Sequence, residues 1–207
     1  KRDPRLGMSI IFPTETFLGY TAHPWEPSHK DAIGKEGSTK TGYWIKKWAN
    51  ETDRTNYSST DGGKLDFQNM RYAVVLLNYV EALNEYDPGN PDIEKYLNLI
   101  RERGGLGPVQ SGLSQELMRE QIRLERRIEL CFEQLRYFDT RRWLIAEQTD
   151  GGPFYGMNVD AGNSFTDEAF YEKTVFETRV FRPEFYLFPI PQSEINRDPQ
   201  IVQNPGW

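Results

Sequence analysis

Apolar residues recur at helical spacing from about residue 67 onward. Ala73, Leu76, Val80 and Leu83 are separated by three, four and three positions, which places their side chains on one face of a helix. The sequence Asp-Pro-Gly at residues 87–89 ends this segment, because proline and glycine do not continue a helix. The pattern therefore predicts an amphipathic helix that ends just before residue 87.

A second helix is expected directly after this turn. Asn90 suits the N-cap and Pro91 the first helical position, and the paired glycines at residues 104–105 provide the stop. Its inward-facing residues are predicted to be Ile93, Leu97 and Ile100. A third helical region, from about residue 114 to about residue 148, exceeds a typical globular helix in length, so we expect a bend or break near its middle. Helices joined by tight turns predict stacked αα-hairpins.

Turn-forming residues dominate on both sides of the helices. Residues 1–66 combine Gly, Pro, Ser, Thr and Asn with short apolar runs, a pattern that predicts loops with a few short strands. Residues 67–148 hold the helical hairpins. Residues 149–207 are expected to form a surface loop excursion up to about residue 174, followed by a proline-punctuated C-terminal wrap over the helices. The three segments are interpreted as parts of one mainly α domain.

The composition is that of a folded domain. Of the 207 residues, 37% are hydrophobic and 27% are charged, and the formal net charge is −6. These values provide for a packed core and exclude both a charge-driven disordered tail and a strongly basic nucleic-acid-binding protein. No apolar stretch approaches the length of a transmembrane helix, which takes about 18 residues. The chain starts at Lys1 without an initiator methionine, a targeting core or a lipidation signal, so we expect it to be part of a longer protein.

Residue types that often carry enzyme chemistry are scarce. Cys131 is the single cysteine, and the two histidines, His23 and His29, both lie near the start. An internal disulfide and a cysteine-based zinc site are therefore excluded for this chain alone. A phosphate-binding glycine loop, a serine nucleophile motif and a Cys/His metal array are missing from the sequence. We predict no cofactor and no metal site. The sequence does not decide whether a structural Ca²⁺ is bound, because acidic residues are many but do not have EF-hand spacing.

Two carboxylates form the strongest candidate for catalysis. Arg126, Glu129, Glu133 and Arg136 are spaced three, four and three apart, so a continuous helix would place them on one stripe. Such a pair is typical of a glycosidase or of a carboxylate-bridged metal centre. The metal centre would need histidines that this region lacks, and neighbouring arginines would keep both carboxylates ionised. We therefore predict an ion network that braces adjacent helices. The adjacent apolar stripe places Cys131 in the packed core with Ile128, Leu135 and Phe138.

Aromatic side chains are concentrated in the loops near the start of the chain. Sugar rings stack on exposed aromatic faces, so a loop platform of aromatic side chains is a candidate glycan-binding site. The alternative is that these side chains fold inward and attach the loops to the helices. The residues that we select as candidate ligand contacts are Trp25, Tyr43, Trp44 and Tyr57.

A string of short motifs resembles the SusD/RagB family of outer-membrane nutrient-binding lipoproteins from Bacteroidota-type bacteria. Each motif is weak alone, but their order along nearly the whole chain is highly specific. Val74 stands where the family usually has Glu, and Gly104 replaces another small residue. The motifs are DPRL at residues 3–6, TGY at 41–43, RYAVVLLNYVEALN at 71–84, LNLIRERGGL at 97–106, ERRIELCFEQLRYFDTRRW at 125–143, FPIPQSEI at 188–195 and QNPGW at 203–207.

The resemblance implies a fold of tetratricopeptide-like helix pairs with a loop-rich subdomain and short β-strands. It also implies that this chain is the C-terminal part of such a protein. The implied role is non-catalytic capture of oligosaccharides or polysaccharides at the cell surface and their delivery to a TonB-dependent SusC-like transporter. Family members carry an N-terminal lipid anchor in the outer membrane, in a part that this chain lacks. The signature at residues 125–143 is implied to be structural.

Three alternatives stay open beside glycan capture. The first is a peptide-capture member of the same family, which would bind more broadly and through backbone contacts. The second is a glycoside hydrolase that uses two of the carboxylates. The third is a tetratricopeptide scaffold that binds only proteins and has no use for the aromatic loops.

Overall fold

The protein is described from a computed structural model that covers residues 2–13, 15–24, 26–32, 34–49, 68–158 and 167–207. The chain forms two compact units, Lys1–Leu135 and Arg136–Trp207. This division lies at neither of the boundaries, near residues 66 and 148, that the composition of the chain suggests.

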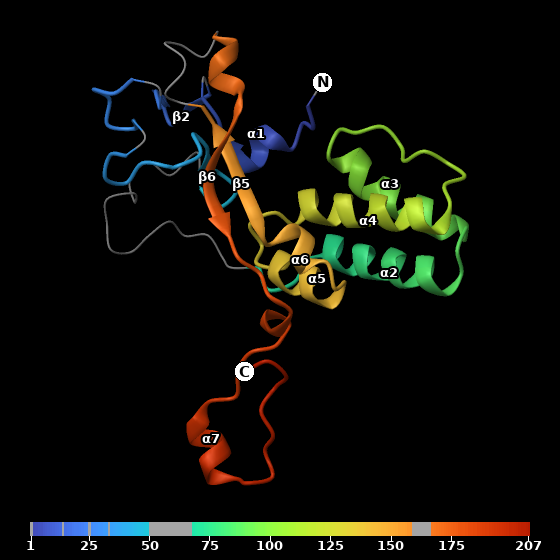
Figure 1. Cartoon of the computed structure of the whole chain (residues 1–207). Coiled ribbons are helices and arrows are strands. Elements are labelled where there is room, and N and C mark those ends of the chain that lie inside the picture. Colours follow the sequence, from blue (N-terminus) through green and yellow to red (C-terminus); the bar gives the residue numbers. More distant parts are fainter. Residues whose placement is uncertain (1, 14, 25, 33, 50–67, 159–166) are drawn as a thin grey trace. The chain divides into compact units, whose positions relative to one another are not determined.

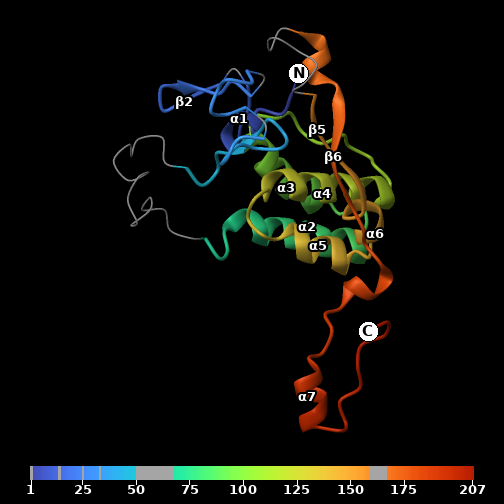
Figure 2. The same ribbon diagram turned by 60° about the vertical axis from the view of Figure 1, so that its left-hand side comes forward.

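Three helices form the core of the first unit. Helices α2 (Tyr72–Tyr86), α3 (Pro91–Arg103) and α4 (Gln115–Glu129) lie side by side in both views (Figures 1 and 2). The predicted inward faces are confirmed, because Ala73, Leu76, Val80, Ile93, Leu97 and Ile100 are buried and Leu83 packs against the same cluster. Burial of such side chains is the main source of stability in a helix pair.

Local capping explains where α3 and α4 begin. The Asn90 side chain accepts a hydrogen bond from the backbone N–H of Asp92 at 3.0 Å, and Pro91 occupies the first position of α3. At the start of α4, the hydroxyl of Ser114 accepts a hydrogen bond from the backbone N–H of Leu117 at 3.3 Å. Both caps satisfy N–H groups that a helix leaves without partners in its first turn.

Short strands precede the helices, as the turn-rich composition predicts. Helix α1 (Leu6–Ser9) leads into β1 (Ile10–Ile11), which pairs antiparallel with β4 (Trp44–Ile45). Strands β2 (Thr16–Phe17) and β3 (Tyr20–Thr21) form a hairpin. Its two-residue turn has positive φ at both positions, 53° at Leu18 and 80° at Gly19, as a type I′ turn requires.

The predicted break in the third helical region is confirmed. Helix α4 ends at Glu129, and helices α5 (Arg136–Arg142) and α6 (Ala146–Thr149) follow in the second unit. Between α4 and α5 the chain turns through left-handed backbone conformations, with φ of 62° at Phe132 and 64° at Gln134. A helix cannot continue through residues in this conformation.

A β-ribbon replaces the loop that we expected in the second unit. Strand β5 (Gly152–Met157) pairs antiparallel with β6 (Lys173–Arg179), with an irregularity between Phe154 and Tyr155. The glycines and Pro153 of this segment are compatible with pairing because a two-stranded ribbon consists only of edge strands, where proline is tolerated. The other elements of the unit are the 3₁₀ helices η1 (Glu168–Tyr171) and η2 (Pro183–Tyr186) and helix α7 (Gln192–Arg197).

The fold class is mainly α with short strands, as predicted. Within the described part of the chain, no helix has both the length and the apolar character that spanning a membrane requires.

Candidate functional site

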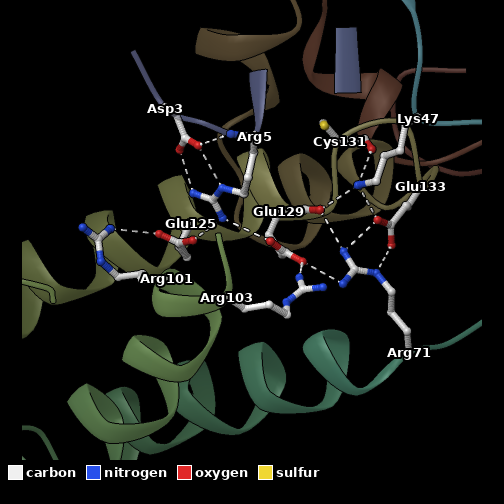
Figure 3. Close-up of polar contacts among 10 residues, drawn as sticks. All are labelled: Asp3, Arg5, Lys47, Arg71, Arg101, Arg103, Glu125, Glu129, Cys131 and Glu133. Carbon is white, nitrogen blue, oxygen red and sulfur yellow. Dashed lines mark hydrogen bonds and ion pairs between the residues drawn. The ribbon is translucent and has the colours of Figure 1, made fainter. Parts of the chain in front are cut away.

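Glu129 and Glu133 meet at one place in the first unit, although not by the predicted route. The expectation of a single helical stripe through Arg126, Glu129, Glu133 and Arg136 is wrong, because α4 ends at Glu129. Glu133 lies in the turn that follows, between two residues with positive φ. The turn folds the Glu133 carboxylate back toward Glu129 so that both reach the same arginine (Figure 3).

That arginine is Arg71, which directly precedes α2. Its guanidinium donates to both oxygens of Glu133, with Nε to Oε2 at 2.8 Å and Nη2 to Oε1 at 2.7 Å. Nη1 also donates to Oε1 of Glu129 at 2.7 Å. Paired N–H···O bonds between a guanidinium and a carboxylate are among the strongest and most directional polar contacts in proteins. Arg71 therefore joins the start of α2 to the end of α4.

Arg5 makes the corresponding connection on the other side of Glu129. Its Nη1 donates to Glu125 at 2.5 Å and to Oε2 of Glu129 at 3.1 Å, while Nε and Nη2 bond to the carboxylate of Asp3. Arg5 is only 7% exposed. Three carboxylates thus surround one buried guanidinium, which compensates for the loss of its hydration.

Two arginines of α3 complete the network. Arg101 donates to Oε2 of Glu125 at 3.0 Å, and Arg103 donates to Oε1 of Glu129, the oxygen that Arg71 also contacts. Side chains of α4 therefore bond to α3, to the residue that precedes α2 and to the N-terminal segment. The predicted ion network is confirmed, but its cations come mainly from distant parts of the sequence.

Lys47 and Trp48 attach the N-terminal loop to the turn after α4. The ammonium of Lys47 donates to the backbone carbonyls of Glu129 and Cys131, at 2.8 and 3.1 Å, and lies 2.6 Å from Oε1 of Glu133. The indole N–H of Trp48 donates to the carbonyl of Phe132 at 2.8 Å. These bonds satisfy carbonyls at the last residue of α4 and in the turn that follows it.

The network determines the protonation state of Glu133. Burial by itself would raise its pKa, but hydrogen bonds from Arg71 and Lys47 outweigh burial and hold the pKa below its ordinary value. The carboxylates of Glu133 and Glu129 in turn raise the pKa of Arg71, against the opposing effect of burial. A general acid needs a raised pKa. The geometry therefore argues against Glu133 as the proton donor of a glycosidase.

A cavity of about 360 Å³ opens beside this network. Its walls combine the aromatic ring of Trp48 and the apolar side chains of Met8 and Ile128 with cationic groups. The polar side chains that line it are Arg5, Ser9, Lys47, Gln68, Arg71, Arg103, Glu129 and Glu133. An aromatic wall beside hydrogen-bonding groups is a common composition for a small-ligand site.

The four aromatic residues selected from the sequence are only partly described. Trp25 and Tyr57 lie outside the described residues, and Tyr43 and Trp44 are half-buried. Trp44 belongs to β4, opposite Ile11. Neither Tyr43 nor Trp44 lines the cavity beside the ion network. Their role in binding stays a prediction.

A polar cluster around Tyr20 was missed by sequence reasoning. The Tyr20 hydroxyl donates to Asp31, its ring stacks on His29 at a centroid distance of 5.9 Å, and Lys30 lies 4.1 Å from its centroid. Burial and the contact with Asp31 raise the pKa of Tyr20 to about 12, so the hydroxyl stays a donor at neutral pH. The signal in the sequence is the placement of both histidines near the loop aromatics.

Cys131 does not occupy the predicted core stripe. It lies half-buried in the turn after α4, and Phe138 is exposed, because the helix on which the stripe was drawn stops at Glu129. Among the described residues, no group of three or more His, Cys, Asp or Glu side chains has a geometry that would hold a metal ion.

Comparison with known proteins identifies the family. A sequence model of the SusD family matches residues 1–207. The chain belongs to the SusD family. It is 33% identical over 148 residues to SusD-like protein P2 of Formosa agariphila, an alignment that covers 67% of this chain and 25% of that protein. The motif string, from DPRL to QNPGW, therefore identified the family correctly.

Solved structures of SusD-like proteins share the fold. A SusD-like protein from Bacteroides fragilis superposes with a TM-score of 0.82 at 30% identity, over 100% of this chain and 39% of that one. A SusD-like carbohydrate-binding protein from the same species gives 0.80 at 29% identity, over 96% of this chain and 41% of that one. The chain thus spans well under half the length of these relatives.

Proposed function

We propose that this SusD-family protein captures glycans at the bacterial cell surface without chemically altering them. The observation that carries the proposal is the family match over residues 1–207. A structural neighbour at 29% identity is described as a SusD-like carbohydrate-binding protein, which supports a glycan as the ligand. The loop aromatics Tyr43 and Trp44, together with Trp25 and Tyr57, are the proposed stacking residues in this part of the protein.

The ion network argues against a catalytic role for its carboxylates. Glu129 and Glu133 are the most suggestive carboxylate pair in the chain, and each bonds to at least two cationic side chains. The oxygens of both carboxylates are thus occupied as hydrogen-bond acceptors, and hydrogen bonds from Arg71 and Lys47 hold the pKa of Glu133 below its ordinary value. The proposed function therefore assigns these two residues to the architecture of the helix pairs.

The proposed partner is a TonB-dependent SusC-like transporter, to which the captured glycan would pass. The proposed location is the outer surface of the outer membrane, with attachment through an N-terminal lipid anchor that lies outside this chain. No nucleic acid and no cofactor form part of the proposal.

Calorimetry tests the capture role. The full-length protein, without its lipid, is titrated with a panel of plant and host polysaccharides and with peptide digests, and the same mixtures are assayed for new reducing ends. Saturable heat with at least one glycan and no new reducing ends is expected. Heat from peptides alone would instead favour peptide capture.

The hydrolase alternative has its own control. Release of reducing ends that is abolished by Glu129→Gln or Glu133→Gln would overturn the non-catalytic role. Tight binding of the SusC-like transporter with no response to any glycan or peptide would favour a scaffold that binds only proteins.

A further inference from the structure

The cavity beside the ion network carries an excess of positive charge. Four of its lining residues are cationic, Arg5, Lys47, Arg71 and Arg103, whereas two are carboxylates, Glu129 and Glu133. Asp3, Glu125 and Arg101 belong to the same network but do not line the cavity. With them, the described network has five cations and four carboxylates. Each carboxylate of the network already accepts bonds from the cations around it.

Of the cations in this network, Arg103 is the most accessible to solvent. Glu129 accepts bonds from three guanidiniums, and one of its oxygens is shared between Arg71 and Arg103. Arg103 is the exposed member, with 62% of its side chain accessible. It uses one nitrogen on Glu129 among the described residues, whereas a guanidinium has five N–H donors. Arg103 can therefore receive a second anion without abandoning the first.

The aromatic and apolar residues that line the same cavity suit a sugar ring. Trp48 is anchored through its indole N–H to the carbonyl of Phe132, and Met8 and Ile128 add apolar surface. At about 360 Å³, the cavity falls within the range of small-ligand sites, about 300–1,000 Å³. A cavity of this size, lined by both Trp48 and Arg103, has room for a small saccharide and its acidic substituent.

We propose that this cavity binds an anionic group on the captured glycan, a carboxylate or a sulfate ester, through Arg103, with Trp48 packing against the sugar ring. The inference rests on the proposed glycan capture and narrows its substrate class to acidic saccharides. Arginine suits the task because its planar fork matches oxyanions in a bidentate geometry and stays charged at all physiological pH values. The partial burial of Arg71 and Arg5 behind it limits screening of the positive potential.

Matched ligands test the charge requirement. The full-length protein is titrated with a uronate-containing oligosaccharide and its carboxyl-reduced form, and with a sulfated oligosaccharide and its desulfated form. We expect at least one acidic oligosaccharide to bind at least ten-fold more tightly than its neutral counterpart. Raising the NaCl concentration from 50 to 500 mM should reduce this difference in affinity. The pair that shows the advantage identifies the anion. Equal affinities within both pairs would overturn the inference.

Arg103→Gln tests the residue, with Arg127→Gln as the matched control because Arg127 is an exposed arginine of α4 outside the cavity. Arg103→Gln should weaken binding of the acidic ligand about ten-fold and leave the neutral twin unchanged, while Arg127→Gln changes neither. An equal loss for both twins would contradict the assignment. Because Arg103 is exposed, thermal unfolding should confirm that the variant is folded.

The two proposals fail in different ways. Binding of neutral glycans alone, unaffected by Arg103→Gln, would leave glycan capture intact and overturn the anionic site. No binding of any glycan, acidic or neutral, would overturn glycan capture and the anionic site with it.

Discussion

Arg71 joins two segments that lie 58 and 62 residues apart from it in the sequence, at Glu129 and Glu133. The two carboxylates are nearly buried, with 3% and 8% of their side chains exposed. Removing the guanidinium would leave both carboxylates with fewer hydrogen-bond partners at a place that is largely shielded from water. A buried charge that loses its partner costs far more than the net contribution of the intact pair.

Arg71→Ala should therefore lower the free energy of unfolding by about 3 kcal/mol. The exposed Arg127→Ala on α4 should change it by no more than about 0.5 kcal/mol. Urea denaturation of both variants measures the difference. A loss below about 1 kcal/mol for Arg71→Ala would show that the bonds of Arg71 contribute little to stability.

The same contacts predict how stability depends on pH. Arg71 and Lys47 hold the pKa of Glu133 below its ordinary value of 4.5, against the opposing effect of burial, and Arg5 lowers the pKa of Asp3. A carboxyl with a depressed folded-state pKa stabilises the protein fully above its unfolded-state pKa. This contribution is lost as the pH falls through the folded-state pKa.

The free energy of unfolding should consequently be flat near neutrality and fall as the pH drops below about 4.5. Glu133→Gln should be less stable than the parent at pH 7 and should show a shallower decline at acidic pH. Denaturation curves at several pH values measure both slopes. Parallel declines in the parent and the variant would contradict the assigned role of Glu133.

Gly104 provides a steric test of the network at the end of α3. A Cβ atom at this position would lie 3.0 Å from Cδ and 3.1 Å from Nε of Arg5, and 3.3 Å from the carbonyl of Arg101. Arg5 cannot retreat easily because three carboxylates hold it. The small residue is needed here because the arginine passes so close to the helix end.

Gly104→Ala should cost about 1–2 kcal/mol of stability through this overpacking. Gly107→Ala is the matched control, since a Cβ there meets nothing within 4 Å. Thermal unfolding of the two variants separates the effect of crowding from the general effect of replacing glycine. Similar midpoints for both would show that Arg5 relaxes freely.

Among the elements, α3 shows how closely periodicity predicts burial. Leu97 is fully buried and Leu99, on the other face of the same helix, is 46% exposed. Leu97→Ala should destabilise the protein by about 2–5 kcal/mol because it leaves a cavity in the core. Leu99→Ala removes the same atoms at little cost. Comparable losses in urea denaturation would contradict the packing of α3.

The detailed form of two elements depends on the surrounding structure rather than on local patterns. Residues 130–135 carry no proline or glycine, yet α4 stops at Glu129 because Phe132 and Gln134 adopt left-handed conformations. The carbonyls freed by this turn are bonded by Lys47 and Trp48. The glycine-rich segment of β5 forms a strand because β6 pairs with it from about 20 residues away.

For the protein as a whole, family membership and much of the helical fold followed from local information. Helical periodicity and the caps at Asn90 and Ser114 depend on residues within a few positions of one another, so they can be recognised in the sequence before any contact is known. The ordered motifs from residue 3 to residue 207 likewise identified the SusD family.

The partners of Glu129 could not be foreseen in this way. Nearby arginines in the sequence suggested Arg126 and Arg136, whereas the bonds come from Arg5, Arg71 and Arg103, up to 124 residues away. An ion pair depends on the distance between two side chains in space, and that distance is set only when helices and loops pack together. The same packing creates the cationic cavity beside Trp48, which no local pattern in the chain marks.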